Sequence, residues 1–486
     1  MEKRLGVLFH VASLKSDYGI GDFGKSAFEF IDFLAEKKVK IWQVLPLVDT
    51  DVTNCPYFST CYFSFDTMFI SPDDLVFRNL INPIELKNLK LLKNSVRIDY
   101  GAVKCEKLRL LNLAFKNLDE NLLNQVKFEC KNNEHLRKYA VYKALCDVYG
   151  YEWRNFPFLL NDEKNPKYLK FFDEHYKQIL KYVFFQYILK QQWQKVRSYA
   201  NRRGVVILGD IPIYPNRNSF DVYLNPEWYL LDKNKNPVVF GGMPPDDFNK
   251  NGQCWGSCVY DWKKLAKYDY EYVIGKIRRV LDYYDILRID HFIGYVKHWE
   301  IDAKNGNPLL GKWKESGGSE FFKRLLEQVD GKRLVVEDLG TALPEVEKVR
   351  KELKLKGMNV LQFASQEGGN RRYLPENVVE NSLYYLGTHD NNTFIGFLKS
   401  LSQDERRKFL QMLKINAKDD GDICIQCVKK MLASKSDTII LQMQDFLLQD
   451  ENFRINIPGQ AKGCWDYRAP KNYKKTFSKT AHRILS

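Results

Sequence analysis

The sequence has no long apolar run and few cysteines. None of its apolar stretches approaches the roughly 18 to 20 residues that a membrane span needs, so we expect no membrane-spanning helix. Ten cysteines in 486 residues favour reduced thiols over a disulfide framework. The segment "MEKRLGVLFHVASL" begins basic and apolar, but His10 interrupts it and no clean small-residue cleavage site follows. We therefore expect a cytoplasmic protein whose first apolar run is a core strand.

Metal-ligand spacing is also missing. Cys424 and Cys427 form one CxxC, "CIQC", which could indicate redox or metal chemistry. No second CxxC and no paired histidine accompany it, and the segment has a helical pattern, so buried thiols are the favoured interpretation. The seven histidines are dispersed. We expect no metal and no cofactor.

The net charge of +14 comes from 75 Lys and Arg against 61 Asp and Glu. These basic residues are scattered through helical patterns such as "EKLRLLNLAFKNL" rather than gathered in a tract. Zinc-finger spacing and RNP-like aromatic motifs are missing as well. The pattern favours a solvated basic surface over nucleic-acid binding.

Short apolar runs recur along the chain, mostly with helical patterns between them. The runs span residues 4–11, 40–47, 205–211, 285–290, 333–338, 358–363, 383–390 and 438–445. Helical patterns occupy, for example, residues 24–38, 270–284 and 343–353. Eight alternating units predict an α/β protein with a (β/α)8 TIM barrel, a doubly wound sheet being the alternative. We interpret residues 1–486 as one decorated barrel.

Two connections are too long for simple loops. Residues 48–204 separate the second and third runs and contain a strong helical pattern at 183–204. Residues 212–285 are rich in Gly, Pro, Asn and aromatics, as in "NPVVFGGMPPDDFNKNGQCWGSCVYDW". Insertions at the carboxyl face of a barrel build substrate clefts, and aromatic rings suit the apolar faces of sugars. We predict inserted subdomains there.

The segment "GIGDFG", residues 19–24, fits the G-x-G-x-x-G pattern of dinucleotide-binding folds and precedes a helical pattern. In such folds the glycines follow a strand directly, whereas residues 12–18 intervene here. We favour a tight loop with Asp22 near the helix start.

Polar residues collect at the carboxyl ends of the apolar runs. They are Asp210, Asp290, Glu337, Asp338, Gln362, His389, Asp390 and Asp445. In a barrel these ends converge on the face where active sites lie. A ring of carboxylates repels itself unless a substrate, metal or arginine accompanies it, so the pattern favours a functional site.

"DILRIDHFIGY" places Arg288 two residues before Asp290 on an expected strand. Residues two apart on a strand share a face, and an arginine beside a carboxylate favours its ionised form. A structural ion pair at a strand end and a functional site are both compatible with this stretch alone.

The segments "LRIDHF", "VVEDLG" and "LGTHDNNT" resemble, in this order, the amylomaltase family, the 4-α-glucanotransferases of glycoside hydrolase family 77, related to α-amylases. "GVLFHVASLKSDYGIGDFG", "IWQVLPL", "GDIPIY", "NPEWYLLD", "MNVLQF" and "RINIPG" extend the resemblance nearly end to end. The family is a (β/α)8 barrel with inserted subdomains that retains anomeric configuration without a metal cofactor.

The resemblance implies a role for individual residues. Asp290 would be the nucleophile, Glu337 the acid/base and Asp390 the third carboxylate. Arg288, His389 and Asp210 would be their immediate partners, and Tyr57, Tyr100, Gln253, Trp255 and Asn456 fall in motifs that line the glucan site. Phe248, Gln253 and Trp255 are candidates for the acceptor site.

The chemistry needs these residue types in any case. A retaining pair of carboxyl groups sits about 5 to 5.5 Å apart. Asp290 must be ionised, which Arg288 promotes. Glu337 must first be protonated, so its pKa should be raised.

Four positions depart from the family pattern. Cys55 stands where Ser is common, Asp247 where an aromatic is expected, Ile293 where Arg is usual and Asn392 where the family often has an acid. These departures bear on outer subsites and acceptor preference.

We interpret the chain as an intracellular 4-α-glucanotransferase that disproportionates malto-oligosaccharides. An α-amylase-type hydrolase is an alternative, because it would use the same carboxylates. A non-catalytic glucan-binding protein is another, against which the intact set of Asp290, Glu337 and Asp390 speaks.

Overall fold

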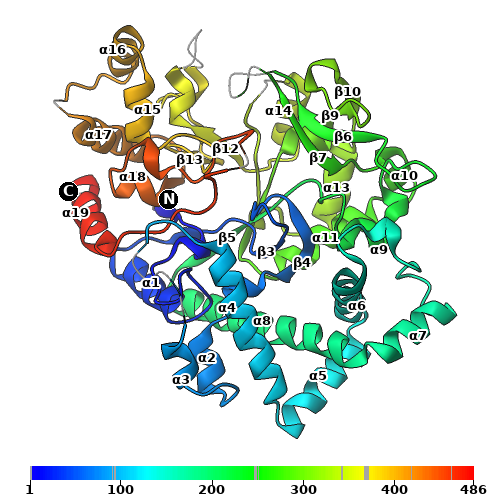
Figure 1. Cartoon of the computed structure of the whole chain (residues 1–486). Coiled ribbons are helices and arrows are strands. Elements are labelled where there is room, and N and C mark those ends of the chain that lie inside the picture. Colours follow the sequence, from blue (N-terminus) through cyan, green and yellow to red (C-terminus); the bar gives the residue numbers. More distant parts are fainter. Residues whose placement is uncertain are drawn as a thin grey trace.

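A computed structural model describes residues 3–89, 91, 95–245, 249, 251–340, 343–365, 371–417, 419–460 and 462–485. In this part of the chain, eight parallel strands form one sheet at the centre of the molecule (Figure 1). They are β1 (Arg4–Leu8), β2 (Ile41–Gln43), β5 (Val206–Ile211), β8 (Ile286–Ile289), β11 (Leu334–Val336), β12 (Gly357–Val360), β13 (Ser382–Tyr385) and β14 (Thr438–Gln442). Each predicted run overlaps one of these strands.

The sheet closes on itself. Strands pair in chain order from β1 to β11, and β1 also pairs with β14, which continues to β13 and β12. The remaining gap is bridged where Val335 pairs with Lys356 and the Val336 N–H donates to the Lys356 carbonyl over 2.8 Å. The predicted (β/α)8 barrel is therefore confirmed, and the doubly wound alternative is wrong.

The strands are buried on both faces, as parallel strands in a barrel are. Val7, Ile289, Val336 and Ile440 are fully buried. At Gly209 in β5, a Cβ atom would lie 2.1 Å from the ring of Tyr284, so only glycine fits. Close packing of these apolar side chains fixes the barrel and hence the positions of the residues at its carboxyl ends.

Helices surround the barrel. They include α1 (Lys25–Glu36), α8 (Tyr176–Arg202), α11 (Glu271–Leu281), α12 (Phe292–Val296), α13 (Gly318–Gln328), α14 (Pro344–Glu352), α15 (Phe394–Ser400), α16 (Gln403–Met412), α17 (Asp420–Ala433), α18 (Met443–Phe446) and α19 (Tyr473–Leu485). The predicted helical patterns correspond to α1, α8, α11 and α14.

The connection from β2 to β5 holds the hairpin β3 (Val48–Thr50) and β4 (Ser59–Phe65) with six helices before α8. These are α2 (Pro72–Phe77), α3 (Ile84–Lys87), α4 (Tyr100–Lys116), α5 (Glu120–Asn132), α6 (Glu134–Tyr149) and α7 (Pro166–Glu174). The connection from β5 to β8 holds α9 (Phe220–Leu224), α10 (Trp262–Ala266), β6 (Val239–Met243) and β7 (Gln253–Cys258). β6 and β7 join β9 (Lys297–Asp302) and β10 (Lys312–Glu315) in an antiparallel sheet that the sequence analysis did not predict (Figure 1).

Two sequence motifs have structural roles in packing. A Cβ atom on Gly21 of "GIGDFG" would lie 1.9 Å from the Val11 carbonyl oxygen, so this glycine packs against the chain itself. Asp22 forms a buried ion pair with Lys107 over 2.9 Å. Cys424 and Cys427 are buried in α17. Among the described residues, no group of three His, Cys, Asp or Glu could hold a metal ion.

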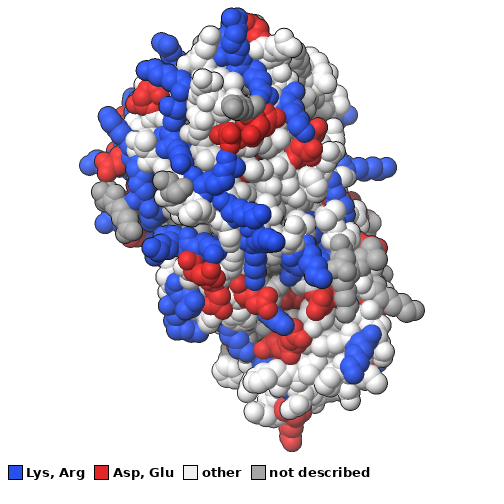
Figure 2. Space-filling view, turned by 90° about the vertical axis from the view of Figure 1, so that its left-hand side faces the viewer, with Lys and Arg blue, Asp and Glu red and all other residues white. Residues whose placement is uncertain are grey.

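None of the helices in the described ranges is both long and apolar enough to cross a membrane. On the face in Figure 2, Lys and Arg side chains form a discontinuous band that acidic and uncharged residues interrupt.

Candidate active site

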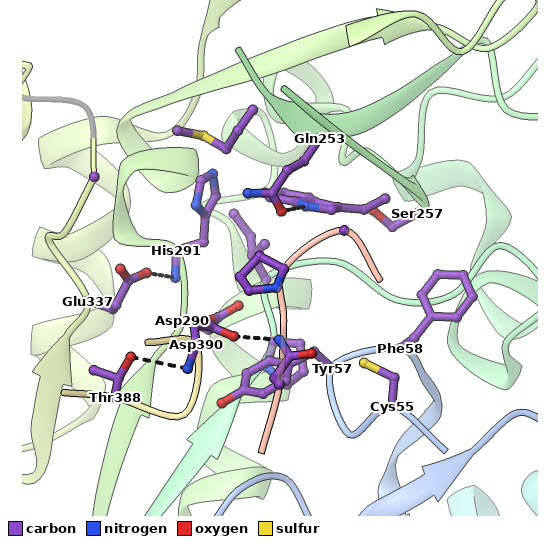
Figure 3. Close-up of a pocket in the computed structure, with 18 of the residues that line it drawn as sticks. Cys55, Tyr57, Phe58, Gln253, Ser257, Asp290, His291, Glu337, Thr388 and Asp390 are labelled. Atoms are coloured by element: carbon purple, nitrogen blue, oxygen red, sulfur yellow. Dashed lines mark hydrogen bonds between the residues drawn. The ribbon is translucent and has the colours of Figure 1, made fainter. Parts of the chain in front are cut away.

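A cavity of about 490 Å³ opens at the carboxyl ends of the barrel strands (Figure 3). Its lining includes eight predicted site residues: Tyr57, Gln253, Trp255, Arg288, Asp290, Glu337, Asp390 and Asn456. Figure 3 shows the three carboxylates on one side of the cavity, with Cys55 and Phe58 on the opposite side. Residues from strands β5 to β13 and from the long connections therefore meet at one place.

Arg288 joins the carboxylates. Its Nη1 lies 2.9 Å from Asp290 Oδ1 and 2.8 Å from Asp210 Oδ2, while Nη2 lies 3.9 Å from Glu337 Oε2. Arg288 and Asp210 are buried, whereas the side chains of Asp290 and Glu337 keep 21% and 16% of their surface exposed toward the cavity. The expected pairing of Arg288 with Asp290 is thus observed, and one guanidinium faces three acids.

Glu337 follows β11 and accepts a hydrogen bond from the backbone N–H of His291 over 2.8 Å. His291 has φ +51°, a left-handed conformation that is uncommon for residues other than glycine. This backbone conformation, immediately after Asp290, lets the main chain reach Glu337. The His291 ring packs edge-on against Trp255 at 4.8 Å, and burial lowers the pKa of His291 to about 3. The ring is therefore neutral.

Asp390 is held by three neighbouring side chains. Asn456 donates to Asp390 Oδ1 over 2.6 Å, and His389 Nε2 lies 3.3 Å from Oδ2. Arg454 donates to the Asp390 backbone carbonyl over 2.9 Å. With 40% of its side chain exposed, Asp390 keeps acceptor capacity for a bound molecule.

Three predicted contact residues lie behind the cavity wall. His389 stacks on Tyr57 with ring centroids 4.9 Å apart and planes within 9°, and Tyr57 donates to Asp210 Oδ2 over 2.7 Å. The Tyr100 hydroxyl donates to the Trp465 carbonyl over 2.7 Å. His389, Asp210 and Tyr100 are therefore outside the lining and position residues that belong to it. Phe248 and Asp247 lie outside the described residues.

Burial raises the pKa values of two of the acids. The pKa of Asp290 is raised to about 7, mainly by loss of solvent and then by Asp210 and Asp390, against the lowering effect of Arg288. The pKa of Glu337 is raised to about 8 by burial and by Asp290. The raised pKa of Glu337 has the direction predicted from the sequence, whereas for Asp290 burial outweighs the lowering effect of Arg288 on which the prediction rested. Because Asp290 contacts the guanidinium more closely than Glu337 does, Arg288 favours the ionised form of Asp290 more strongly.

Some lining residues were not predicted. They include Tyr214, Met243, Thr388, Asn391 and Trp465. Thr388 and Asn391 flank His389 and Asp390 in "GTHDNNT", and the Thr388 hydroxyl donates to Asn391 Oδ1 over 2.9 Å, so their place in that segment was an available signal. Trp465 lies 5.8 Å from Tyr57 between ring centroids, a contact that no local pattern predicts.

Among the departures, Cys55 lines the cavity, and burial raises the pKa of its thiol to about 12. Ile293 is buried in α12. The Asn392 backbone carbonyl accepts a hydrogen bond from Gln362 over 2.9 Å.

The raised pKa values predict a pH-dependent stability. A carboxyl whose pKa is higher in the folded than in the unfolded protein favours folding while protonated, and this contribution is lost as pH rises from about 4 to about 8. Asp290→Asn and Glu337→Gln should therefore raise Tm more at pH 9 than at pH 5. Thermal unfolding measures this, with the exposed Glu376→Gln as a control that shifts Tm equally at both pH values. If Asp290→Asn and Glu337→Gln also changed Tm by the same amount at pH 5 and at pH 9, the prediction would be contradicted.

Comparison with known proteins places the chain among characterised relatives. A family model described as 4-alpha-glucanotransferase matches residues 9–473. The 4-alpha-glucanotransferase of Aquifex aeolicus is 35% identical over 479 residues, which cover 98% of this chain and 97% of the relative. That of Clostridium butyricum is 34% identical, with 95% and 96% covered.

Solved structures of amylomaltases are also similar to this chain. The amylomaltase from Streptococcus agalactiae, in complex with acarbose, is 28% identical and superposes with a TM-score of 0.92 over 100% of this chain and 99% of the other. The amylomaltase from Corynebacterium glutamicum, at 16% identity, shares the fold with a TM-score of 0.78 over 99% of this chain and 74% of the other.

Proposed function

The chain belongs to the 4-α-glucanotransferase family and has that activity, and from this premise we propose that the cavity at the barrel's carboxyl face is its active site. Asp290 is the nucleophile, Glu337 the general acid and base, and Asp390 the third carboxylate. The observation that supports this assignment best is the Arg288 guanidinium, which contacts Asp290 and lies 3.9 Å from Glu337 at the cavity floor.

Transfer takes two steps. An Asp290 oxygen attacks the anomeric carbon while Glu337 gives its proton to the departing glycosidic oxygen, which leaves a covalent glycosyl-enzyme. Glu337, now a carboxylate, takes the proton from the 4-hydroxyl of an acceptor glucan as that oxygen attacks the same carbon and releases Asp290. Two inversions retain the anomeric configuration.

The environment suits these roles. At the pH where Asp290 has lost its proton, Glu337 with its higher pKa still holds one. Arg288 stabilises the single negative charge of the pair. Asp390, whose carboxylate faces the cavity, is placed to accept hydrogen bonds from the sugar hydroxyls beside the reacting carbon.

Malto-oligosaccharides and longer α-1,4-glucans are the proposed substrates. The aromatic rings of Tyr57, Trp255 and Trp465 offer apolar faces, and the amides of Gln253 and Asn456 offer donors and acceptors for sugar hydroxyls. The similar Streptococcus agalactiae amylomaltase was solved in complex with acarbose, which supports a sugar as the ligand of this chain. We also propose a cytoplasmic place in starch or glycogen metabolism, with residues 48–204 and 212–285 as the subdomains that build the cleft.

Maltotriose distinguishes transfer from hydrolysis. An oriented acceptor can outcompete water because positioning supplies effective molarities far above the roughly 55 M of bulk water. We expect glucose plus longer glucans, with a nearly constant number of reducing ends. Product chromatography beside a reducing-end assay measures this. Reducing ends that rise in step with maltotriose consumed would indicate a hydrolase, and no turnover would indicate a binding protein.

A further inference from the structure

Residues 149–158, "YGYEWRNFPF", contain five aromatic rings that the active site does not use. This stretch connects α6 to α7 in the long insertion (Figure 1). Tyr149 and Tyr151 are 44% and 59% exposed. Trp153 and Phe158 are buried, and two exposed rings beside them in one short segment indicate contact with a partly apolar ligand.

A second cavity of about 380 Å³ lies against this stretch. It is lined by Trp153, Arg154, Phe156, Pro157, Phe158, Leu159, Asp162, Asn165, Asn234 and Lys235. None of these residues lines the active-site cavity. Leu159 is 44% exposed, which is high for a leucine beside so many rings.

Arg154 has unused donor capacity at this cavity. Its Nη2 donates to Asn218 Oδ1 over 2.7 Å and forms an ion pair with Glu152, and its guanidinium lies 5.2 Å from the Trp153 ring. Its Nη1 is buried and has no hydrogen-bond partner among the described residues. A buried donor without a partner is costly, so Arg154 would be stabilised if its side chain turned to bring this donor to an oxygen of a bound molecule.

Residues 216–218 contact lining residues of both cavities. Asn216 pairs with Ser257 of the active-site lining. The next residue, Arg217, accepts a hydrogen bond at its carbonyl from the Trp153 indole over 2.9 Å, and Asn218 accepts from Arg154. This short segment therefore connects the lining of the active-site cavity with the lining of the second cavity.

The lining indicates a neutral polyhydroxylated ligand. Both signs of charge are present, with Arg154 and Lys235 against Asp162, and two amides add donors and acceptors. The apolar rings beside them match the C–H faces of a sugar. An anion would meet the Asp162 carboxylate, which disfavours it.

We propose that this cavity is a second glucan-binding site, which holds a remote part of a long α-1,4-glucan whose reacting end lies at Asp290. The inference rests on the proposed function. Two linked sites on one chain raise the affinity for long glucans through effective concentration, whereas a short oligosaccharide occupies one site at a time.

Leu159→Ser tests the site, with Leu169→Ser on α7 as the matched control, since Leu169 is 51% exposed and lies outside both cavities. We expect the ratio of KM for amylose to KM for maltotriose to rise about fivefold in Leu159→Ser relative to Leu169→Ser, which corresponds to about 1 kcal/mol. An unchanged ratio would overturn the inference. Because maltotriose turnover by the unaltered enzyme tests the proposed function separately, the two failures are distinguishable.

A binding measurement does not depend on turnover. The Asp290→Asn variant is saturated with acarbose and titrated calorimetrically with maltoheptaose. We expect residual maltoheptaose binding that the additional change Arg154→Gln weakens at least threefold. Absence of residual binding, or binding that Arg154→Gln leaves unaltered, would contradict a second site here.

Discussion

Replacing Asp290 by asparagine is expected to lower kcat for maltotriose disproportionation by about four orders of magnitude. The amide has the shape of the carboxylate but no charge with which to attack the anomeric carbon. Arg288 keeps its two contacts with Asp210, so the buried guanidinium remains paired. Product chromatography over long incubation measures kcat, and thermal unfolding shows that the variant is folded.

Asp445→Asn is the matched control. Asp445 also follows a barrel strand and is buried, and its pKa is likewise raised to about 7, but it accepts a hydrogen bond from the Phe394 N–H over 2.7 Å and does not line the cavity. We expect its kcat to stay within about threefold of the unaltered enzyme, in the range of a modest local perturbation. The nucleophile assignment fails if Asp290→Asn retains more than about a tenth of the activity.

Replacing Glu337 by alanine should lower kcat with maltotriose by about three orders of magnitude. The loss should be far smaller in the first step with α-maltosyl fluoride, because fluoride leaves without a proton. Added azide, which needs no general base, should then attack the glycosyl-enzyme and yield α-maltosyl azide. NMR of the product gives the anomeric configuration, and β-maltosyl azide would assign Glu337 as the nucleophile instead.

The same variant tests the protonation states. In the unaltered enzyme, kcat/KM should fall below about pH 7 as Asp290 binds a proton and above about pH 8 as Glu337 loses one. These two limits belong to the interacting pair. With α-maltosyl fluoride, Glu337→Ala should retain only the acidic limb, and persistence of the basic limb would assign it to another group.

The barrel was predictable because its strands are nearly continuous apolar runs, and such runs stand out from the helical patterns around them. The antiparallel sheet was not predictable. β6 reads "VFGGM" and β7 reads "QCWGSC", and neither has the alternation of apolar and polar residues that indicates a half-buried strand. β6 pairs with β7 on one side and, on the other, with β9, which comes much later in the chain.

The sequence predicts which residues lie at the strand ends of the candidate site, but it does not predict how deeply each of them is buried. In the sequence Asp210, His389 and Asp390 lie at the ends of apolar runs. In the structure Asp210 and His389, which contact Tyr57 from a distant insertion, are buried, whereas Asp390 is partly exposed. Trp465 reaches the cavity from a loop with no strand or helix pattern of its own. The pKa of Asp290 depends on burial as much as on Arg288, and burial is a property of the whole fold.

The weak pairing between β11 and β12, where the barrel closes, affects where the barrel can open locally. Among the described residues, these strands share only the bridge at Lys356, while β1 and β14 are paired over five residues. Asp338 compensates with its side chain, which accepts from the Met358 N–H over 2.8 Å and pairs with Arg350. Local opening is easiest where the fewest main-chain hydrogen bonds must break. We therefore expect the barrel to open locally first beside β11, the strand that Glu337 follows, so the proposed acid and base lies at the least strongly hydrogen-bonded edge of the barrel.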